Sequence, residues 1–473
     1  MTKSRAVQWL VVGLCSTILV TVGVIGATQH RTLLTAAGLE VEGGSPTIDA
    51  TVFVEPTLPP EPSVPANLAP PAERTSDGTA PDPASLQQQL DALEVGELVD
   101  ADGNPATLAY EVRDAATGEV LASRNDATGL IPASNTKTLT VLAVFNAFDG
   151  DERFATTVVA PEAGAIVLVG GGDPLLRSEP APADTYPRPP SLRELATATA
   201  EALLADGTTT VTLGFDESRF EGSGWAETWP SGYRSQVTEI SALWADEGRA
   251  NGGRSRTPAL EAAQVFAEQL GELGVTVDGE PSAAAGSGEE LARVESLPVH
   301  VLAEQAMVRS NNSFTEVLGF QLAHHTGHPT TFAGSTAAIQ EQLTGLGLWE
   351  ENTRLDDASG LSRSNRFSAG LLARANLALV TEPRLTAVLD GLPVAGVTGT
   401  LAERFSDPLA RPARGVARAK TGTLSFVSSL AGTTTTDDGA VVVFAFMANG
   451  QVNGWFAKHW EDQAVGIITG CGC

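Results

Sequence analysis

The chain begins with a long uncharged stretch, and this stretch decides on which side of a membrane the rest can fold. Ala6 to Ala27 are 22 consecutive residues without a charge, most of them apolar, and Lys3 and Arg5 precede them. Their length matches the roughly 20 residues of a membrane-spanning helix and exceeds the roughly 7–15 of a signal-peptide core. Residues 1–30 are therefore predicted to be a signal peptide or a membrane anchor, with an uncleaved anchor favoured because the cleavage pattern is poor. Either form puts the rest of the chain outside the cytoplasm.

A proline-rich segment follows this stretch. Ten prolines lie between Pro46 and Pro83, separated by small and polar residues with few large apolar ones. Such a composition favours a semi-extended spacer over a packed domain. Residues 31–84 are predicted to be a disordered linker, and folded structure is expected from about residue 85.

Charge and cysteine content exclude several classes of protein. The net charge is -28, from 29 basic and 57 acidic residues, so no nucleic-acid partner is expected, since phosphate binding needs a basic face. The three cysteines are Cys15, Cys471 and Cys473, and none lies in the body of the chain, so no disulfide framework and no cysteine zinc site is predicted. Cys471 and Cys473 could pair with each other, pair between chains or stay free.

The pattern of apolar residues predicts helices and strands in alternation, hence a mixed fold. Residues 151 to about 256 are expected to form a unit of their own, with short strands around a helix. The predicted helices are Ser85–Val95, Ala133–Phe148, Leu192–Leu204, Pro258–Leu273 and Pro298–His324. The predicted strands are Thr107–Arg113, Val120–Arg124, Ala155–Val159, Ala165–Val169, Thr209–Leu213, Ser425–Gly432 and Ala440–Met447.

Lysine is rare in this chain, and two of the four lysines lie in short motifs. Ser134-Asn-Thr-Lys137 falls at the start of a predicted helix, where residues three apart share a face. The lysine amine is therefore expected beside the serine hydroxyl. A neutral lysine there can take the serine proton and make it a nucleophile. The motif by itself is common by chance.

Two further motifs follow in the chain. Lys420-Thr-Gly-Thr423 lies just before a predicted strand, where the glycine permits a substrate to approach the strand edge and the threonine hydroxyls can hold a carboxylate. Ser310-Asn-Asn312 lies inside a predicted helix. Ser123-Arg-Asn125 matches the same short pattern, and only the order along the chain favours Ser310.

Four longer stretches carry a resemblance to a known family. They are Ile131-Pro-Ala-Ser-Asn-Thr-Lys137, Leu168-Val-Gly-Gly-Gly-Asp-Pro-Leu175, Ser359-Gly-Leu-Ser-Arg-Ser-Asn-Arg-Phe-Ser368 and Leu392-Pro-Val-Ala-Gly-Val-Thr-Gly-Thr-Leu401. With the three motifs in their order, the chain from about Ser85 onward resembles the D-alanyl-D-alanine carboxypeptidase/endopeptidase family, the low-molecular-mass class C penicillin-binding proteins.

This resemblance implies an α+β fold. Its core is of the serine β-lactamase/penicillin-binding transpeptidase type, an antiparallel sheet flanked by helices, and a smaller α/β domain is inserted into it. The predicted division is core at 85–150, inserted domain at 151–256 and core again at 257–473. The insertion is short for the family, so the second nested subdomain of some relatives is expected to be missing.

The resemblance also implies a role for each motif residue. Ser134 resembles the acylated nucleophile and Lys137 its general base. Ser310 and Asn312 resemble the proton relay and the contact to the substrate amide, and Lys420 the electrostatic partner of that relay. Asn311 stands where the family often has Asp.

The remaining roles concern substrate binding. Thr421, Gly422 and Thr423 are implied to bind the substrate, the two threonines through its terminal carboxylate. The backbone N–H groups of Ser134 and Thr423 are implied to form an oxyanion hole. No metal and no organic cofactor is expected.

The implied function is that of a cell-envelope D-Ala-D-Ala carboxypeptidase that acts on peptidoglycan stem peptides through an acyl-enzyme and binds β-lactams. The same site could open D-alanyl cross-links as an endopeptidase. A β-lactamase is the enzymatic alternative, although no Glu-x-x-Leu-Asn-like segment supplies the base for fast deacylation. A wall-binding protein without activity is the other alternative. A metal site at His324, His325 and His328 is disfavoured, since no second ligand cluster accompanies them.

Overall fold

The computed structural model of the protein describes residues 78–250, 253–383 and 385–472. The predicted anchor or signal peptide (1–30) and residues 31–77 of the predicted linker lie outside this part of the chain. None of the helices within the described ranges combines the length and apolarity needed to span a bilayer. The described residues belong to one compact unit, Glu73–Cys473.

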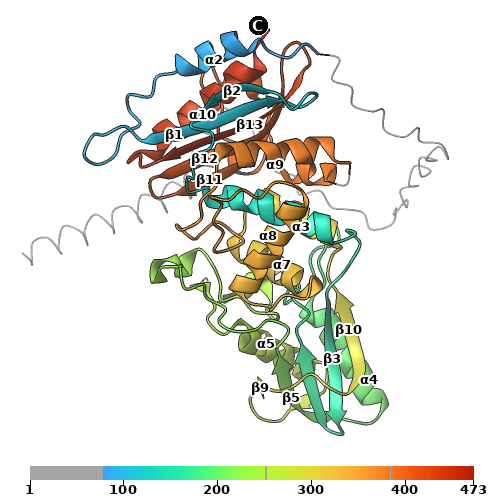
Figure 1. The fold of residues 1–473 in the computed structure, drawn as a ribbon. Helices are drawn as coiled ribbons and strands as arrows, with labels where there is room; N and C mark the ends of the chain where they lie inside the picture. Colours follow the sequence, from blue (N-terminus) through green and yellow to red (C-terminus); the bar gives the residue numbers. More distant parts are fainter. Residues whose placement is uncertain (1–77, 251–252, 384, 473) are drawn as a thin grey trace, which may run out of the picture. The chain divides into compact units, whose positions relative to one another are not determined.

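The central element of this unit is a five-stranded antiparallel sheet with strand order β11-β12-β13-β1-β2 (Figure 1). Two strands come from the start of the described chain and three from its end. Strand β1 joins the two groups by pairing with β13, with Tyr110 opposite Phe446. The strands are β1 (Thr107–Asp114), β2 (Val120–Arg124), β11 (Arg418–Leu424), β12 (Val427–Thr435) and β13 (Val441–Asn449).

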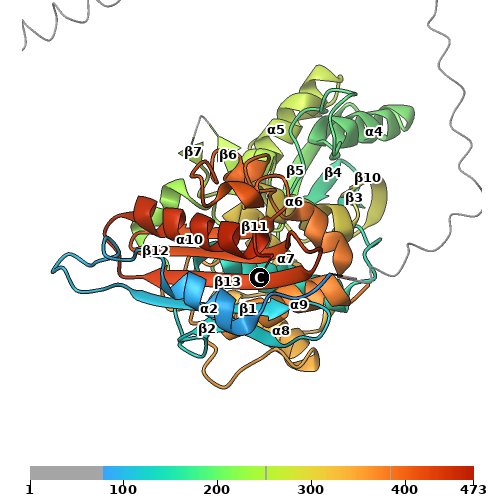
Figure 2. The same ribbon diagram turned by 90° about the horizontal axis from the view of Figure 1, so that it is seen from above.

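Both faces of this sheet are buried. Alternate residues of β13 enter different cores: Phe444 and Phe446 pack on one face, whereas Ala445 and Met447 pack on the other. This is the two-residue period of a strand with helices on both sides. Helices α2 (Pro83–Asp91) and α10 (Gly454–Thr469) cover the first face, and α9 (Ala369–Thr381) covers the second (Figures 1 and 2).

Helix α3 (Thr136–Ala147) lies at the centre of the second core. Residues 136–145 are all buried, which explains its apolar composition and its lack of a polar face. The predicted buried helix is thus confirmed, although its first residues, Ala133–Asn135, form a 3-10 turn. The helices packed around it are α6 (Val299–Arg309), α7 (Asn312–His325), α8 (Phe332–Gly345) and α9.

The chain segment between α3 and α6 forms a second sheet. Its strand order is β10-β3-β4-β5-β8, and β9 pairs with β5. Two helices, α4 and α5, cover one face of it (Figure 1). The Ser191–Glu194 capping box fixes the start of α4. The elements are β3 (Ala155–Glu162), β4 (Ala165–Val169), α4 (Leu192–Ala205), β5 (Thr210–Asp216), α5 (Pro258–Glu272), β8 (Thr276–Val277), β9 (Ser282–Ala283) and β10 (Glu289–Glu295).

The predicted end of the inserted domain at residue 256 is too early. Helix α5 and strands β8, β9 and β10 follow that residue, and all of them pack with the second sheet. In the sequence, α5 has the same amphipathic pattern as the later helices of the core, so the pattern alone places the boundary before it. We therefore propose limits of 151–295 for the inserted domain. A short hairpin of β6 (Arg249–Ala250) and β7 (Gly253–Arg254) lies within this segment.

The predicted helix Pro298–His324 is wrong in one respect, since the structure breaks it at Ser310. That residue has φ 50°, in the left-handed region, and the Asn311 side chain caps the next helix by accepting a hydrogen bond from the Phe314 N–H. Serine and asparagine compete with the helix backbone for hydrogen bonds and favour such ends. Helices α8, α9 and α10 were not predicted.

Candidate active site

Ser134 lies in the 3-10 turn that leads into α3, one turn before Lys137. The Lys137 Nζ lies 2.9 Å from the Ser134 Oγ. Ser134 is partly exposed, whereas Lys137 is completely buried. The predicted side-by-side arrangement of hydroxyl and amine is therefore present, with the hydroxyl on the accessible side.

The Lys137 amine has two other partners, the Oδ1 of Asn312 at 2.7 Å and the carbonyl oxygen of Ser359 at 2.6 Å. Both can only accept hydrogen bonds. A neutral amine that donates its two N–H groups to them directs its lone pair at the Ser134 hydroxyl. Burial lowers the pKa of Lys137 from 10.5 to about 7, and the nearby carboxyl groups of Asp357 and Glu316 oppose this fall. The neutral amine is thus accessible near neutral pH.

The second lysine pairs with the second serine. The Lys420 Nζ donates to the Ser310 Oγ at 2.7 Å and to the carbonyl oxygen of Thr421 at 2.9 Å. Lys420 is completely buried, and burial together with the charge of Lys137 lowers its pKa well below 10.5. Ser310 reaches this lysine from the break between α6 and α7. The break that the helix prediction missed is thus what carries Ser310 to the site.

Strand β11 forms the edge of the sheet beside the Ser134 turn, and Gly422 allows close approach there. A Cβ atom on Gly422 would lie 3.1 Å from the Ser134 N and 2.5 Å from the carbonyl oxygen of Pro132. The Thr421 hydroxyl bonds to the Thr400 hydroxyl at 2.8 Å, and Thr423 is exposed. The strand therefore presents its threonines next to the serine turn.

An open cavity of about 310 Å³ connects these residues. Lys137, Gly422 and Lys420 do not line it directly but lie behind its wall. Two of the lining side chains carry positive charge, Arg404 and Lys458, and none of the lining side chains is acidic. The lining residues are Ser134, Gln236, Ser310, Asn312, Thr400, Arg404, Thr421, Thr423 and Lys458.

All eight predicted site residues are therefore brought together. Ser123 of the alternative motif lies on β2, at the opposite edge of the sheet from β11. Four lining residues were missed, namely Gln236, Thr400, Arg404 and Lys458. Thr400 belongs to one of the stretches that carried the resemblance, and Lys458 is one of only four lysines, so both had a signal in the sequence.

Two buried carboxylates support the loop that contains Ser359. Glu316 accepts hydrogen bonds from the N–H groups of Ala358 and Ser359 at 3.0 and 2.8 Å. Asp357 accepts from the Gly360 N–H at 2.9 Å. Burial and the neighbouring Asp357 raise the pKa of Glu316 to about 8. These hydrogen bonds hold the loop whose carbonyl oxygen binds Lys137. No sequence signal singled out either carboxylate.

Other candidates do not form sites. The His325 ring packs at a tilt against Phe148, and His328 bonds to Glu341 at 2.7 Å. In the described ranges no group of three or more His, Cys, Asp or Glu side chains could hold a metal ion. Cys471 is disulfide-bonded, so the free-thiol alternative for this residue is excluded.

Solved structures define the class of this fold. Penicillin-binding protein 4 of Haemophilus influenzae superposes with a TM-score of 0.65 at 20% sequence identity, covering 81% of this chain and 98% of that one. A structure of the same protein in complex with a β-lactam superposes with a TM-score of 0.61 at 19% identity, covering 82% and 100%. The fold is that of a penicillin-binding protein, as predicted.

The sequence identifies the family. The chain belongs to the D-Ala-D-Ala carboxypeptidase 3 (S13) family, whose model matches residues 94–252 and 245–470. A carboxypeptidase of Mycobacterium tuberculosis is 35% identical over 80% of this chain and 83% of its own length. Carboxypeptidase DacB of Mycolicibacterium smegmatis is 32% identical over 86% and 90%. The predicted family and enzyme class, serine-type D-Ala-D-Ala carboxypeptidase of the cell wall, are confirmed, and this activity is extracytoplasmic.

Proposed function

We propose that the enzyme cleaves the terminal D-Ala-D-Ala bond of stem peptides through an acyl-enzyme on Ser134, with Lys137 as the base. The observation that carries this proposal is the 2.9 Å contact between the Lys137 Nζ and the Ser134 Oγ, with the other two amine partners restricted to accepting. The Ser134 oxygen attacks the carbonyl carbon of the penultimate D-alanine as its proton moves to Lys137.

The leaving amine needs a proton when the carbon–nitrogen bond breaks. Ser310 is the proposed donor, because its Oγ lies 2.7 Å from the Lys420 Nζ and lines the cavity beside Ser134. Lys420 stabilises the transient negative charge on the Ser310 oxygen. The proton that Lys137 took is returned to the Ser310 oxygen after the amine has left. Water then attacks the acyl-enzyme, its proton passes through Lys137 to the Ser134 oxygen, and the shortened peptide leaves with both serines restored.

Negative charge on the carbonyl oxygen is assigned to the N–H groups of Ser134 and Thr423. The close approach at Gly422, 3.1 Å from the position of a Cβ to the Ser134 N, supports this assignment. Fixed backbone donors of this kind are worth roughly 10²–10³ in rate.

The free carboxylate of the terminal D-alanine is assigned to Thr421 and Thr423. Arg404 and Lys458 give the same cavity positive charge in a chain of net charge -28. This favours a substrate with a free C-terminal carboxylate, hence carboxypeptidase action, with cleavage of D-alanyl cross-links as the second activity.

β-Lactam binding follows from the same chemistry. A β-lactam offers a strained amide and a carboxylate at the spacing of D-Ala-D-Ala, and the complex of the Haemophilus influenzae protein supports the extension to this chain. Retention of the resulting acyl group for minutes or longer distinguishes this function from a β-lactamase. Anchoring of the enzyme through residues 1–30 remains a proposal.

D-Alanine release from a pentapeptide, and from a cross-linked dimer, tests the proposed function. The parent is expected to release D-alanine, and S134A is expected to lose this activity. S123A is the matched control, since Ser123 belongs to the other Ser-x-Asn pattern and lies on β2. An S134A protein as active as the parent would contradict the proposal, and the two substrates rank the two activities.

A further inference from the structure

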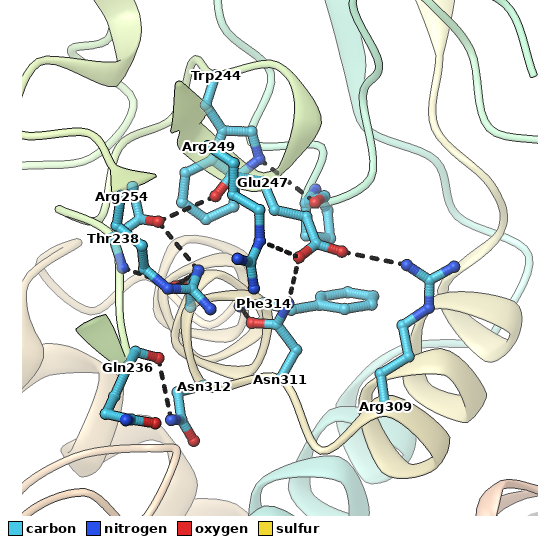
Figure 3. A network of polar contacts seen from close by, with 12 residues as sticks. Gln236, Thr238, Trp244, Glu247, Arg249, Arg254, Arg309, Asn311, Asn312 and Phe314 are labelled. Atoms are coloured by element: carbon cyan, nitrogen blue, oxygen red, sulfur yellow. Dashed lines mark hydrogen bonds and ion pairs between the residues drawn. The ribbon is translucent and has the colours of Figure 1, made fainter. Parts of the chain in front are cut away.

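One carboxylate holds the residues on both sides of Ser310. The Oε1 of Glu247 accepts from Arg309 at 3.1 Å, and its Oε2 accepts from the Asn311 Nδ2 at 2.6 Å (Figure 3). Arg249 adds a longer ion pair at 3.7 Å. Glu247 comes from the inserted segment, whereas residues 309–311 join α6 to α7. The inserted segment thus forms hydrogen bonds and an ion pair on both sides of the turn that carries the proposed proton donor.

These contacts stabilise a turn whose backbone is strained. Ser310 has φ 50°, in the left-handed region that residues other than glycine rarely adopt. From this turn its hydroxyl accepts a hydrogen bond from the Lys420 Nζ at 2.7 Å. Contacts on either side of Ser310 keep the backbone there while leaving the hydroxyl itself free for chemistry.

Further hydrogen bonds join the inserted segment to the residues that follow Ser310. The Asn312 Nδ2 donates to the carbonyl oxygen of Gln236 at 3.2 Å (Figure 3). The Ser313 Oγ accepts from the Thr238 N–H at 2.9 Å. The Arg254 guanidinium donates to the hydroxyls of Thr238 and Ser313 and to neither end of the Glu247–Asn311 contact.

Glu247 is itself held in a strained backbone. It has φ 59°, and the preceding Asp246 has φ 51°. The Asp246 carboxylate accepts from the Ser178 hydroxyl, and the carbonyl oxygen of Glu247 accepts from the Thr238 hydroxyl at 3.0 Å. Two consecutive left-handed residues persist only when their surroundings hold them, and such strain gathers at functional sites.

Asn311 uses both ends of its amide. Its Oδ1 caps α7 by accepting from the Phe314 N–H at 3.2 Å, and its Nδ2 donates to Glu247. Aspartate would cap the helix equally well. It would, however, set a second carboxylate against Glu247, and two carboxylates in contact cannot both be ionised without a large penalty. The amide is therefore the side chain that satisfies both neighbours at neutral pH.

We propose that Glu247 is a positioning residue for Ser310 and that Asn311 is its matched partner, so that the inserted domain sets the proton relay of the core. The inference rests on the proposed role of Ser310 in protonating the leaving group. Among the described residues, Arg309 and Arg249 form ion pairs with Glu247, and Arg254 interacts with it electrostatically.

The charge variant Asn311→Asp tests the pairing. We expect the ratio of its acylation rate to that of the parent, measured with a labelled penicillin, to fall about tenfold to a hundredfold between pH 5 and pH 8. At pH 5 one proton bridges the two carboxylates and restores the contact. The double variant Glu247→Gln/Asn311→Asp is expected to restore the ratio at pH 8, because the glutamine amide donates to the aspartate.

Asn453→Asp is the matched control. Asn453 caps α10 by accepting from the Trp455 N–H at 3.0 Å, and no acidic side chain is bonded to it among the described contacts. Its ratio to the parent should stay flat with pH. An N311D protein whose ratio is equally flat, or a double variant no better than N311D at pH 8, overturns the inference.

A second variant decides the matter if N311D does not fold. Glu247→Ala is expected to slow acylation by an amide substrate about tenfold or more, and to slow acylation by a thioester of the same acyl group much less, because a thiolate leaves without a proton. Equal losses with both substrates overturn the positioning role. S134A separates the two proposals. If S134A is still acylated, the proposed function fails. If acylation requires Ser134 but E247A is acylated at the parent rate with both substrates, only the positioning inference is contradicted.

Discussion

The Lys137 amine has three neighbours, and only the Ser134 hydroxyl can give it a proton. Because its pKa is lowered to about 7, the amine is mostly protonated below that pH and mostly neutral above it. We therefore expect the acylation rate to rise with pH through about 7 and then level. K137R should lose at least about a hundredfold in acylation, since a guanidinium stays protonated. A pH profile with labelled penicillin measures both, and a rate independent of pH between 5 and 9 would count against this base.

Gly422 is the second residue on which the chemistry depends. In G422A the new Cβ would meet the Pro132 carbonyl at 2.5 Å and the Ser429 hydroxyl at 2.2 Å, so the strand must move away from the Ser134 N–H. Loss of one oxyanion donor lowers acylation by about 10²–10³. Gly454 has nothing within 4 Å of its virtual Cβ, so G454A is the matched control and should react like the parent. Equal rates for both variants would exclude a tight approach here.

The residues that the sequence revealed are those whose partners are near in the chain or belong to a motif. Ser134 and Lys137 share one helical turn, and Lys420 is one of four lysines. Gln236 and Glu247 could not be predicted, because each reaches the site from the inserted segment and contacts residues more than sixty positions away. Such contacts depend on how the inserted segment packs against the turn between α6 and α7, which no local pattern encodes.

Elements repeat this division. Strands β1 and β13 were predicted by their alternation and by turn residues. Helix α3 has a high Thr and Val content, so its prediction depended on the Ser-x-x-Lys motif at its start. The break between α6 and α7 was missed, although Ser310-Asn-Asn312 has the composition of a helix end, because the apolar residues on both sides keep the helical period. The end of the inserted domain was missed because α5 resembles any amphipathic helix.

Glu316, which holds the loop after α8, makes the stability of the fold depend on pH. The pKa of Glu316 is raised from 4.5 to about 8, so the folded state holds a proton that the unfolded chain releases. Its contribution to stability is complete below about 4.5 and is lost as the pH rises through about 8. E316Q is uncharged at every pH, so its free energy of unfolding in urea should fall less between pH 5 and pH 8 than that of the parent.

The control for this measurement is E268Q, since Glu268 is exposed on α5. It should keep the full pH dependence of the parent. If E316Q and E268Q lose stability in parallel as the pH rises, the buried carboxyl is not the group responsible.

The negative net charge of the whole molecule contrasts with the positive charge at its active site. The chain carries -28, whereas its active-site cavity is lined by Arg404 and Lys458. Arg404 is already paired with Glu461 and Asp462, which leaves Lys458 to attract a substrate carboxylate. K458Q should lower kcat/KM about ten- to a hundredfold for a peptide with a free C-terminus, and much less for the C-terminal amide. Equal losses for the two peptides would contradict an anion-binding role.

The central claim is that Ser134 is the residue acylated in this molecule. Intact-mass measurement after exposure to penicillin, followed by peptide mapping, tests it most directly. We predict one adduct per chain, located on the peptide that contains Ser134 and absent from S134A. An adduct on a different residue, or a folded parent protein that takes up no penicillin, would contradict the account.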